Sequence, residues 1–312
     1  MQGPRPVVTV VGSLNMDLVI RAPRRPQRGE TLIGDSFATF VGGKGLNQAI
    51  AAARGGAQVR MVGRVGQDDF GGRLLQALAA DGIDARHVVV DDQASTGIAA
   101  IVIDAEGDNS IIIVQGANGR LDAAQIDAAA DTITGADIVV VQLEVPLDAV
   151  QRAAALAHAA GVKVLLNPAP ARPLPDALLR LVDVLAPNET ETQILTGLSV
   201  ADDESASLAA RALLERGVGA AVLTLGARGA LLAERSRALR VPGYTVPVVD
   251  TTAAGDAFCG VLAVELARGE PLERAIRYAN AAGALATTTL GAAPSMPLRA
   301  AIEELVQAGN DA

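Results

Sequence analysis

The sequence is poor in several residue types, and each shortage excludes a class of protein. Cys259 is the only cysteine among 312 residues, which excludes an internal disulfide framework and fits a reducing compartment. Tryptophan is absent, and two Tyr and four Phe leave few rings on which a nucleobase would stack. The two histidines, His87 and His158, match no nucleophile or metal pattern. Cys259 is expected to be a small packing residue rather than a nucleophile.

Long apolar runs and basic clusters are missing as well. Arg, Asp or Glu interrupts every alanine-rich stretch before the length of about 18 residues that a membrane helix needs. The formal net charge of −9 provides no basic surface for nucleic acid or an anionic membrane. The first residues contain Arg5 but no apolar segment typical of a signal peptide. We therefore expect a cytoplasmic protein without a nucleic-acid or membrane partner.

What the chain does contain predicts a large α/β core. Half of its residues are hydrophobic and 20% are charged, so a sizeable core is expected and disorder is not. Apolar β-prone runs alternate with helical periodicity, which predicts a doubly wound, mostly parallel sheet with right-handed crossovers. The expected strands are 7–11, 59–65, 137–142, 163–167, 183–186 and 220–225. The expected helices include one that follows residues 42–47 and runs to about residue 54, and others at 69–81, 146–160, 189–195 and 205–216.

Two β-prone insertions interrupt this alternation. Residues 15–40 are punctuated by proline and glycine, and residues 95–114 contain two β-prone runs around the turn 106–109, which is a hairpin signal. We expect these two segments to form a small sheet apart from the main one. The core would then comprise residues 1–14, 41–94 and 115–312.

The stretch 250–258, DTTAAGDAF, has the pattern of an anion site followed by an acid. The run 246–249 is expected to end a strand, and helical spacing after it predicts a helix that starts near Gly255. Ala253 and Ala254 then lie at the helix start, where free N–H groups attract a phosphate. Asp256 in the first turn would accept a proton from an attacking hydroxyl, although an ordinary helix cap is the alternative.

Polar residues follow the first predicted strand, and a glycine pair begins the loop before a predicted helix. Asn15 and Asp17 come just after residues 7–11, at the edge where open α/β sheets bind ligands, and they suit vicinal hydroxyls or a turn. The loop 42–47, GGKGLN, precedes a helix but lacks the spacing of a P-loop. Glu144 follows another predicted strand and offers an acceptor for a sugar hydroxyl.

The segments GGKGLNQA at 42–49 and DTTAAGDAF at 250–258 together resemble the signature pair of the PfkB-type carbohydrate kinases, the ribokinase family. Further matches run co-linearly from Gly12 to Ser295. The resemblance implies a ribokinase-like fold with a β lid over the sugar, and a homodimer formed through the lids. It also implies transfer of phosphate from ATP to a pentose, with D-ribose phosphorylated at O5.

The resemblance assigns roles to individual residues. It implies Asp256 as the general base and an anion hole at Ala253, Ala254, Gly255 and Asp256. The implied sugar-binding residues are Ser13, Asn15, Asp17, Gly42, Gly43, Lys44, Asn47, Glu144 and Asp256. The implied nucleotide-side residues are Asn188, Glu191, Thr224, Gly226, Arg228, Gly229, Gly255 and Asn280. Glu191 would orient waters of a Mg²⁺ ion, and a K⁺ site would involve Asp250, Thr252, Ala286, Thr289, Gly291 and Ser295.

Several alternatives remain open at this point. Asn188 is also a good helix N-cap, and the segment at Thr224 also fits a hairpin turn. A sister kinase would act on deoxyribose, fructose, a sugar phosphate or a nucleoside instead. A sensor that binds a sugar without turnover would have no use for Asp256. A nucleotide-dependent dehydrogenase is disfavoured, because the residues after Gly12 lack the Gly-x-Gly-x-x-Gly pattern.

Overall fold

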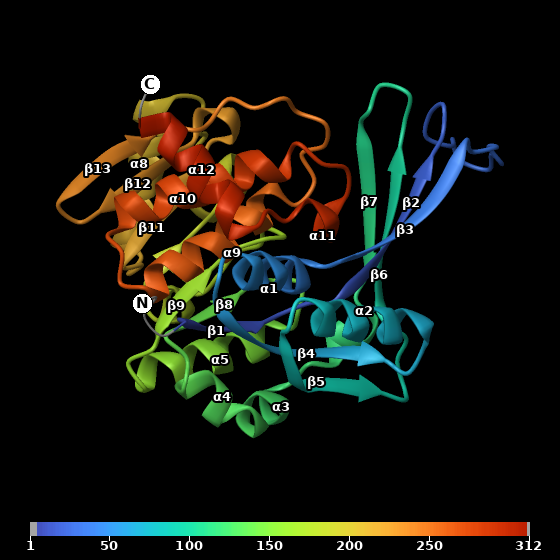
Figure 1. Cartoon of the computed structure of the whole chain (residues 1–312), viewed down its shortest axis with the longest axis horizontal. Coiled ribbons are helices and arrows are strands. Elements are labelled where there is room, and N and C mark those ends of the chain that lie inside the picture. The colour runs from blue at the N-terminus through green and yellow to red at the C-terminus, as the bar shows by residue number, and fades with distance from the viewer. Residues whose placement is uncertain (1–4, 311–312) are drawn as a thin grey trace.

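A nine-stranded, mostly parallel sheet forms the centre of the molecule, as the computed structural model of residues 5–310 shows (Figure 1). Its strand order is β13-β12-β11-β10-β9-β8-β1-β4-β5, with only the β11-β12-β13 pairs antiparallel. The strands are β1 (Val7–Val11), β4 (Gln58–Gly66), β5 (Asp84–Asp91), β8 (Ile138–Val141), β9 (Lys163–Leu166), β10 (Val184–Leu185), β11 (Ala220–Thr224), β12 (Ala230–Glu234) and β13 (Arg237–Val241).

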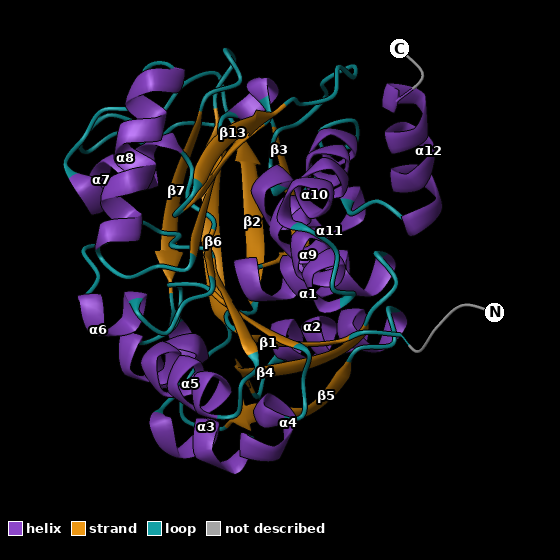
Figure 2. Ribbon diagram, turned by 90° about the vertical axis from the view of Figure 1, so that its left-hand side faces the viewer, coloured by secondary structure: helices purple, strands orange, loops and turns teal. Residues whose placement is uncertain are grey.

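Helices cover both faces of this sheet, as Figure 2 shows in side view. One core layer packs under α1 (Lys44–Arg54), α2 (Asp69–Ala80), α9 (Ala254–Ala267), α10 (Leu272–Ala286), α11 (Ala292–Ser295) and α12 (Arg299–Asn310). The other packs under α3 (Ala123–Ala128), α4 (Ala130–Thr134), α5 (Leu147–Ala159), α6 (Asp176–Leu179), α7 (Glu189–Thr196) and α8 (Asp203–Glu215). Two short 3₁₀ helices, η1 (Gly116–Arg120) and η2 (Gly226–Arg228), complete the chain. The predicted doubly wound α/β fold is confirmed.

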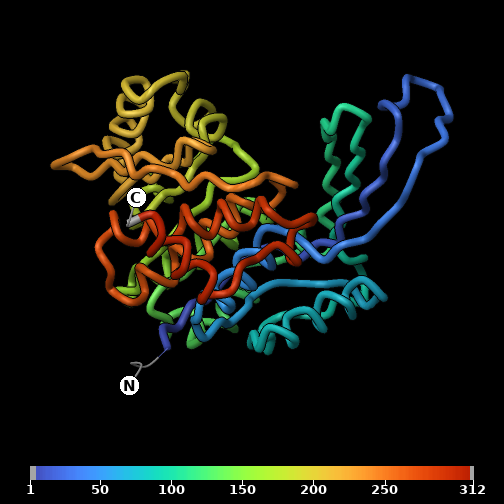
Figure 3. Tube along the Cα trace, turned by 45° about the horizontal axis from the view of Figure 1, so that its top comes forward, coloured from blue at the N-terminus to red at the C-terminus, as the bar shows by residue number. Residues whose placement is uncertain are grey.

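A smaller four-stranded sheet projects from one end of the core (Figures 1 and 3). Its strands are β2 (Asn15–Arg21), β3 (Ser36–Gly42), β6 (Gly97–Ile103) and β7 (Asn109–Val114), in the order β3-β2-β6-β7. The two predicted insertions therefore meet, because β2 pairs in parallel with β6 along its whole length. The expected hairpin is present as the β6-β7 pair.

The prediction of a strand at residues 246–249 is wrong. This segment has no regular secondary structure, and Val248 and Val249 are largely exposed. The backbone N–H groups of Val249 and Asp250 both donate to the Thr287 carbonyl at the end of α10, at 2.8 and 3.1 Å. The β-branched run is therefore held by a helix terminus rather than by a neighbouring strand. The sequence did not predict β5, β12, β13, α3, α4, α11 or α12 either.

The sheet order predicts a ligand site outside the carboxyl ends of β1 and β8. The chain winds from β1 through β4 to β5 on one side and from β8 through β9 to β11 on the other. At such a reversal the loops after adjacent strands diverge, and ligands bind outside their carboxyl ends. Among residues 5–310, no helix is both long and apolar enough to cross a membrane.

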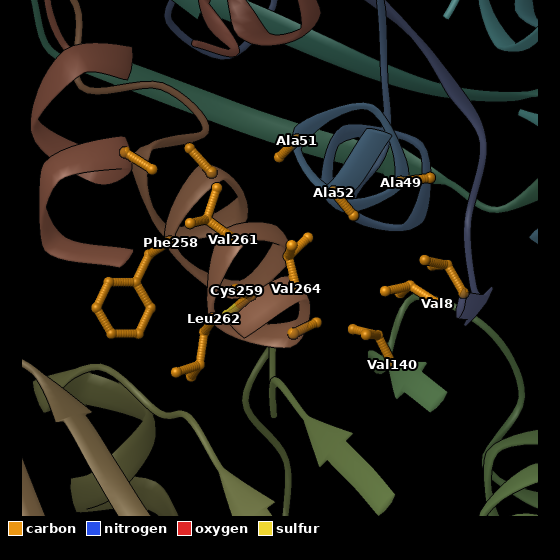
Figure 4. Packing of buried hydrophobic residues seen from close by; sticks show 14 of the residues in the cluster. Val8, Ala49, Ala51, Ala52, Val140, Phe258, Cys259, Val261, Leu262 and Val264 are labelled. Atoms are coloured by element: carbon orange, nitrogen blue, oxygen red, sulfur yellow. The ribbon is translucent and has the colours of Figure 1, made fainter. Parts of the chain in front are cut away.

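Helices α1 and α9 pack closely beside this crevice. A Cβ atom added to Gly260 of α9 would lie 2.6 Å from both the Gln48 carbonyl oxygen and the Ala51 Cβ of α1, so only glycine permits this approach. Figure 4 shows Ala51 and Ala52 of α1 beside Val261 and Val264 of α9. Small side chains on both helices thus bring the residues that follow the glycine pair next to the start of α9.

Candidate active site

The side chains after β1 and β8 converge on Glu144. Ser13 Oγ donates to Glu144 Oε2 at 2.5 Å, and Asn15 Nδ2 donates to the same oxygen at 3.2 Å. The backbone N–H of Lys44 reaches it at 3.2 Å. Two segments that are far apart in the sequence, 13–15 and 44, therefore donate to one buried oxygen of Glu144.

The glycine pair lies directly against this cluster. Gly43 has φ of 91°, which favours glycine, and a Cβ there would lie 2.6 Å from the Asn15 nitrogen. A Cβ on Gly42 would lie 2.3 Å from Asp17 Oδ2. The loop is therefore glycine-rich because its backbone touches the polar residues at the start of β2.

Asp256 lies at the other side of the same cluster, in the first turn of α9. It is 5% exposed, and its Oδ2 accepts a hydrogen bond of 3.0 Å from Asn47 Nδ2 on α1. Its Oδ1 accepts one of 3.0 Å from Gln48 Nε2. Asp256 is therefore not an N-cap, since the cap position belongs to Ala253.

One lysine and four carboxylates make up the electrostatics of the crevice. Burial alone would lower the pKa of Lys44, but the charges of Asp256, Glu144 and Glu191 raise it overall. Burial, followed by the repulsion of Glu144 and Asp256, raises the pKa of Asp17 to about 7. These couplings bring together residues that the sequence assigned separately to the sugar, the base and the nucleotide.

The start of α9 has the features of an anion site. Ala253 is in the left-handed region, with φ of 60°, and α9 follows it for 14 residues. The N–H groups of Gly255 and Asp256 find no acceptor among residues 5–310. A Cβ on Gly255 would meet nothing within 4 Å, so the space beside these groups is open. Unpaired N–H groups and the helix dipole favour a phosphate there.

The predicted nucleotide-side residues begin at the carboxyl end of β10. Asn188 caps α7 in a capping box, in which its side chain accepts from the Glu191 N–H and Glu191 Oε2 accepts from the Asn188 N–H, both at 2.8 Å. The N-cap alternative is therefore also present. An isolated parallel bridge joins Asn188 to Thr224, so the ends of β10 and β11 lie side by side. Burial raises the pKa of Glu191.

The remaining nucleotide-side residues gather around the β11-β12 hairpin. A Cβ on Gly229, whose φ is 93°, would lie 2.3 Å from the Val241 carbonyl oxygen. Asn280 of α10 donates to the Val241 and Pro242 carbonyls at 3.1 and 2.9 Å. Arg228 forms an ion pair of 2.5 Å with Glu189. These residues lie together, and the hairpin alternative for the segment after Thr224 is also correct.

The proposed potassium ligands lie on two segments joined through Asp250. Its Oδ1 accepts from the N–H and hydroxyl of Thr252 at 2.9 and 2.7 Å, and its Oδ2 accepts from the Gly291 N–H at 2.9 Å. Burial opposes ionisation, yet these hydrogen bonds lower the pKa of Asp250 overall. The hydroxyl of Ser295 donates to the Ala292 carbonyl at 2.7 Å. No hydrogen bond links Asp250 to Ala286 or Thr289 in the described residues, so the ion site stays a prediction.

Sequence reasoning missed several amides that support the site. Gln142, Gln48 and Asn167 form a buried hydrogen-bonded chain that ends on Asp256. Asn118 of η1 donates to Asn15 Oδ1 at 2.7 Å and also bonds both backbone groups of Leu14. The only available signal was the position of Gln48 within GGKGLNQA and of Gln142 and Asn167 at strand ends.

The geometry thus combines a buried carboxylate, an open helix N-terminus and a cluster of polar side chains at a strand-order reversal, an arrangement that suits phosphoryl transfer. Residues 6–299 match the model of the pfkB family carbohydrate kinases. The ribokinase of Haemophilus influenzae is 42% identical over 295 residues, which cover 95% of this chain and 96% of that protein. The deoxyribokinase of Salmonella typhi is 38% identical over 291 residues, covering 93% and 95%.

The fold comparison agrees with the sequence comparison. The solved structure of Arabidopsis thaliana ribokinase complexed with ribose and ATP matches with a TM-score of 0.92 at 34% identity, covering 97% of this chain and 99% of that one. The chain belongs to the pfkB family of carbohydrate kinases. It is an ATP-dependent kinase of a sugar, as the resemblance implied.

The raised pKa of Asp17 predicts a pH-dependent penalty on stability. Its pKa is about 7 in the folded chain against 3.8 for the free group, so the folded state binds this proton more tightly. The stability that the proton contributes is complete below pH 3.8 and is lost as the pH rises to about 7. Asp17→Asn should therefore raise the free energy of unfolding more at about pH 8 than at about pH 5. Between pH 5 and pH 7 this gain should grow by up to about 1.4 kcal/mol for each pH unit.

Thermal unfolding of the wild type and Asp17→Asn at both pH values measures this difference. Asp122→Asn is a control, because Asp122 is exposed and caps α3 away from the crevice. A stability difference between wild type and Asp17→Asn that does not change with pH would contradict the burial of an uncompensated carboxylate at this position.

Proposed function

We propose that this kinase transfers the γ-phosphoryl group of ATP to O5 of D-ribose and releases D-ribose 5-phosphate and ADP. The sugar oxygen forms a bond to the γ-phosphorus, and the bond between that phosphorus and the β,γ-bridging oxygen breaks. ADP leaves with the electron pair of that bond, and the hydroxyl proton passes to the Asp256 carboxylate. The observation that carries the proposal is the buried Asp256 carboxylate in the first turn of an open helix N-terminus.

Asp256 is the general base in this proposal. Asn47 and Gln48 fix its two oxygens from one side, and the start of α9 borders it on another. The N–H groups of Gly255 and Asp256, with the small residues Ala253 and Ala254, stabilise charge on the transferring group. One turn of helix therefore supplies both the proton acceptor and the anion hole.

The sugar binds in the crevice lined by Asn15, Asp17, Gly43, Asn47 and Glu144. Carboxylates at Asp17 and Glu144 suit hydroxyl donors, and the Asn47 Oδ1 atom is buried without a partner among the described residues. An unpartnered buried acceptor costs about 1–3 kcal/mol, and a sugar hydroxyl would satisfy it. The second sheet, residues 15–40 and 95–114, acts as a lid that keeps water from the phosphate.

Magnesium accompanies the nucleotide on the side of β10 and β11. Glu191 fits a water-mediated contact to Mg²⁺, because only its Oε2 is used by a donor from residues 5–310. When bound, the ion neutralises the charge on the nucleotide phosphates. Asn188, Thr224, Gly226, Arg228, Gly229 and Asn280 form the adjoining nucleotide site.

Deoxyribose is the main alternative acceptor, because the Salmonella typhi deoxyribokinase is nearly as similar as the ribokinases. Fructose, a sugar phosphate and a nucleoside are further alternatives. A nucleoside is disfavoured, because the chain has few aromatic residues on which its base would stack. The single buried cysteine supports a cytoplasmic location.

A sugar panel with Mg-ATP tests both the substrate and the base. We expect ADP formation that depends on D-ribose, and a loss of kcat of about 10²–10⁴-fold in Asp256→Asn, because the amide cannot accept the proton. The measurement is coupled ADP release with D-ribose, 2-deoxy-D-ribose, D-fructose, fructose 6-phosphate and adenosine, with product position assigned by ³¹P NMR. Asp250→Asn does not serve as a control, because Asp250 belongs to the proposed ion site.

Asp148→Asn is the matched control, because Asp148 lies in the first turn of another helix, α5. It should retain wild-type turnover. Undiminished turnover in Asp256→Asn would remove the proposed base, whereas preferential turnover of another acceptor would move the enzyme to that substrate.

A potassium ion beside the anion hole is a further part of the proposal. Its donor set is Asp250, Thr252, Ala286, Thr289, Gly291 and Ser295, with several carbonyl oxygens. The lowered pKa of Asp250 supports an ionised carboxylate there, and oxygen donors suit a hard cation. Such an ion would order the segment that leads into α9.

Replacing Na⁺ by K⁺ at constant ionic strength should raise kcat severalfold in the wild type. Asp250→Ala should lose this response, because one ion ligand is removed. Steady-state assays across a salt series with each cation measure the effect. Equal rates in both salts would remove the ion from the proposal and leave the base untouched.

A homodimer formed through the lid sheet completes the proposal. β7 is an edge strand, and Ile111, Ile112 and Val114 on it are 52, 69 and 51% exposed. Exposed apolar residues on a free sheet edge favour pairing with another chain. Two such lids would cover each other's apolar residues.

Light scattering on Ile112→Lys tests the dimer. We expect the wild type to have twice the mass of the chain and the variant to be monomeric, because a buried lysine charge opposes the contact. Leu208→Lys on α8 is the control, because Leu208 is 58% exposed and lies away from the second sheet. This variant should remain dimeric. A monomeric wild type would overturn the assignment.

A further inference from the structure

A chain of three buried amide side chains ends on the carboxylate of Asp256. Gln142 Nε2 donates to Gln48 Oε1 at 2.7 Å, and Gln48 Nε2 donates to Asp256 Oδ1 at 3.0 Å. The same Gln48 Nε2 donates to Asn167 Oδ1 at 3.1 Å. We call Gln142, Gln48 and Asn167 the amide relay. All four side chains are less than a tenth exposed.

A backbone carbonyl fixes the polarity of this relay. Asn167 Nδ2 donates to the Ala186 carbonyl oxygen at 3.0 Å, and a carbonyl can only accept. Asn167 must therefore turn its Oδ1 toward Gln48. Gln48 then has to present its Nε2 to Asn167, and its second N–H reaches Asp256. The donor offered to the base is thus set by an atom two side chains away.

Gln142 favours the same orientation of the Gln48 amide but leaves its own oxygen without a hydrogen bond from the described residues. Its Nε2 faces Gln48 Oε1, while its own Oε1 is buried without a partner in the described residues. A Cβ on Gly12 would lie 1.9 Å from that Oε1, so the glycine leaves the room that it occupies. An amide that leaves one atom unsatisfied to donate to Gln48 indicates that the direction of this hydrogen bond matters.

The relay joins elements from both halves of the site. Gln48 is on α1 after the glycine pair, Gln142 directly follows β8 two residues before Glu144, and Asn167 directly follows β9. Ala186 directly follows β10, two residues before Asn188. One buried chain of hydrogen bonds therefore connects the proposed base to the segments that follow β8, β9 and β10.

We infer that Gln48 is a positioning residue for Asp256. Asn167 and Gln142 orient the side-chain amide of Gln48, and the N–H of that amide holds the Asp256 carboxylate in the rotation that faces the reacting hydroxyl. This role rests on the proposed function of Asp256 as the general base. Asn47 donates to Asp256 Oδ2 and Gln48 donates to Asp256 Oδ1, so the carboxylate group cannot rotate freely about its bond to Cβ. Only N–H groups face the carboxylate from α1, so a proton on it would find no acceptor in that direction.

Gln48→Met tests this inference, because methionine keeps the length and the packing but cannot donate. We expect kcat for the ribose reaction to fall by about tenfold to hundredfold, as for other residues that orient a catalytic group. KM for the sugar and for ATP should change by less than about threefold, because binding is not removed. A purely structural role would instead lower the melting temperature and the active fraction, with kcat per active site unchanged.

Gln142→Glu tests the polarity without touching Asp256. At a pH where the introduced carboxyl is ionised it accepts only, so it repels Gln48 Oε1, and Gln48 can relieve this repulsion only by turning its Oε1 toward Asn167 Oδ1 and Asp256 Oδ1. We expect a loss of kcat at least as large as in Gln48→Met. Gln142→Met, which removes the Gln142 donor without adding a competing acceptor, should lose less. An equal effect of the two Gln142 variants would overturn the polarity argument.

The pH profile of kcat separates positioning from packing. Removal of an N–H donor disfavours the charged carboxylate, so the acid limb of the profile should move to higher pH in Gln48→Met. The titratable groups around Asp256 are Lys44 on α1, Asp17 on β2, Glu191 on α7 and Cys259 on α9. At saturating ribose the profile reports ionisations of the enzyme–substrate complex, and comparison with the wild type at the same ribose concentration isolates the change made at Gln48.

The matched control is Gln125→Met on α3. Gln125 also bridges segments through its amide, donating to the Gly63 carbonyl and accepting from Arg64, but away from the crevice. It should keep the wild-type kcat and pH profile. Unchanged kcat and acid limb in Gln48→Met would sink the inference, whereas a wild type without ribose-dependent ADP release would show that the proposed function itself had failed.

Discussion

The close packing of α1 against α9 is the constraint on which the site depends. Gly260 lets the helices approach until Asn47 and Gln48 of α1 bond both oxygens of Asp256. Because both residues directly follow the glycine loop, the same contact sets the distance between the sugar crevice and the helix N-terminus. A displacement of either helix would separate the proposed base from the proposed acceptor.

The sheet provides the second level of organisation. The reversal of strand order between β1 and β8 opens the crevice, and the residues after these strands fill it with carboxylates and amides. The carboxylates of Glu144, Glu191 and Asp256 all act on Lys44, so one positive charge interacts with the proposed sugar, nucleotide and base residues. In the proposed site, ATP would meet that charge and the dipole of α9 rather than a basic surface, which would let an acidic protein bind a phosphorylated nucleotide.

The second sheet grows directly out of the core rather than being a separate unit. β1 leads through Gly12, Ser13 and Leu14 into β2, and Asn118 binds Leu14 and Asn15 at this junction. The proposed sugar-binding residues Asn15 and Asp17 thus belong to the second sheet, whereas Glu144 and Asp256 belong to the core. If the second sheet moves as the proposed lid, it would therefore move two of the proposed sugar-binding residues and not only change the exposure of the site to water.

The sequence by itself determined the fold class, the two β insertions, the family and the main candidate residues, because these depend on local periodicity and on short motifs such as DTTAAGDAF. It failed at residues 246–249, where a β-branched run bonds to the end of α10 instead of a strand. Only the tertiary structure decided the partners of Asp256, since Gln48 lies 208 positions from it and Gln142 lies 94 positions from Gln48. An amide in isolation carries no preferred direction, and the direction appears only when a distant carbonyl such as that of Ala186 accepts from it.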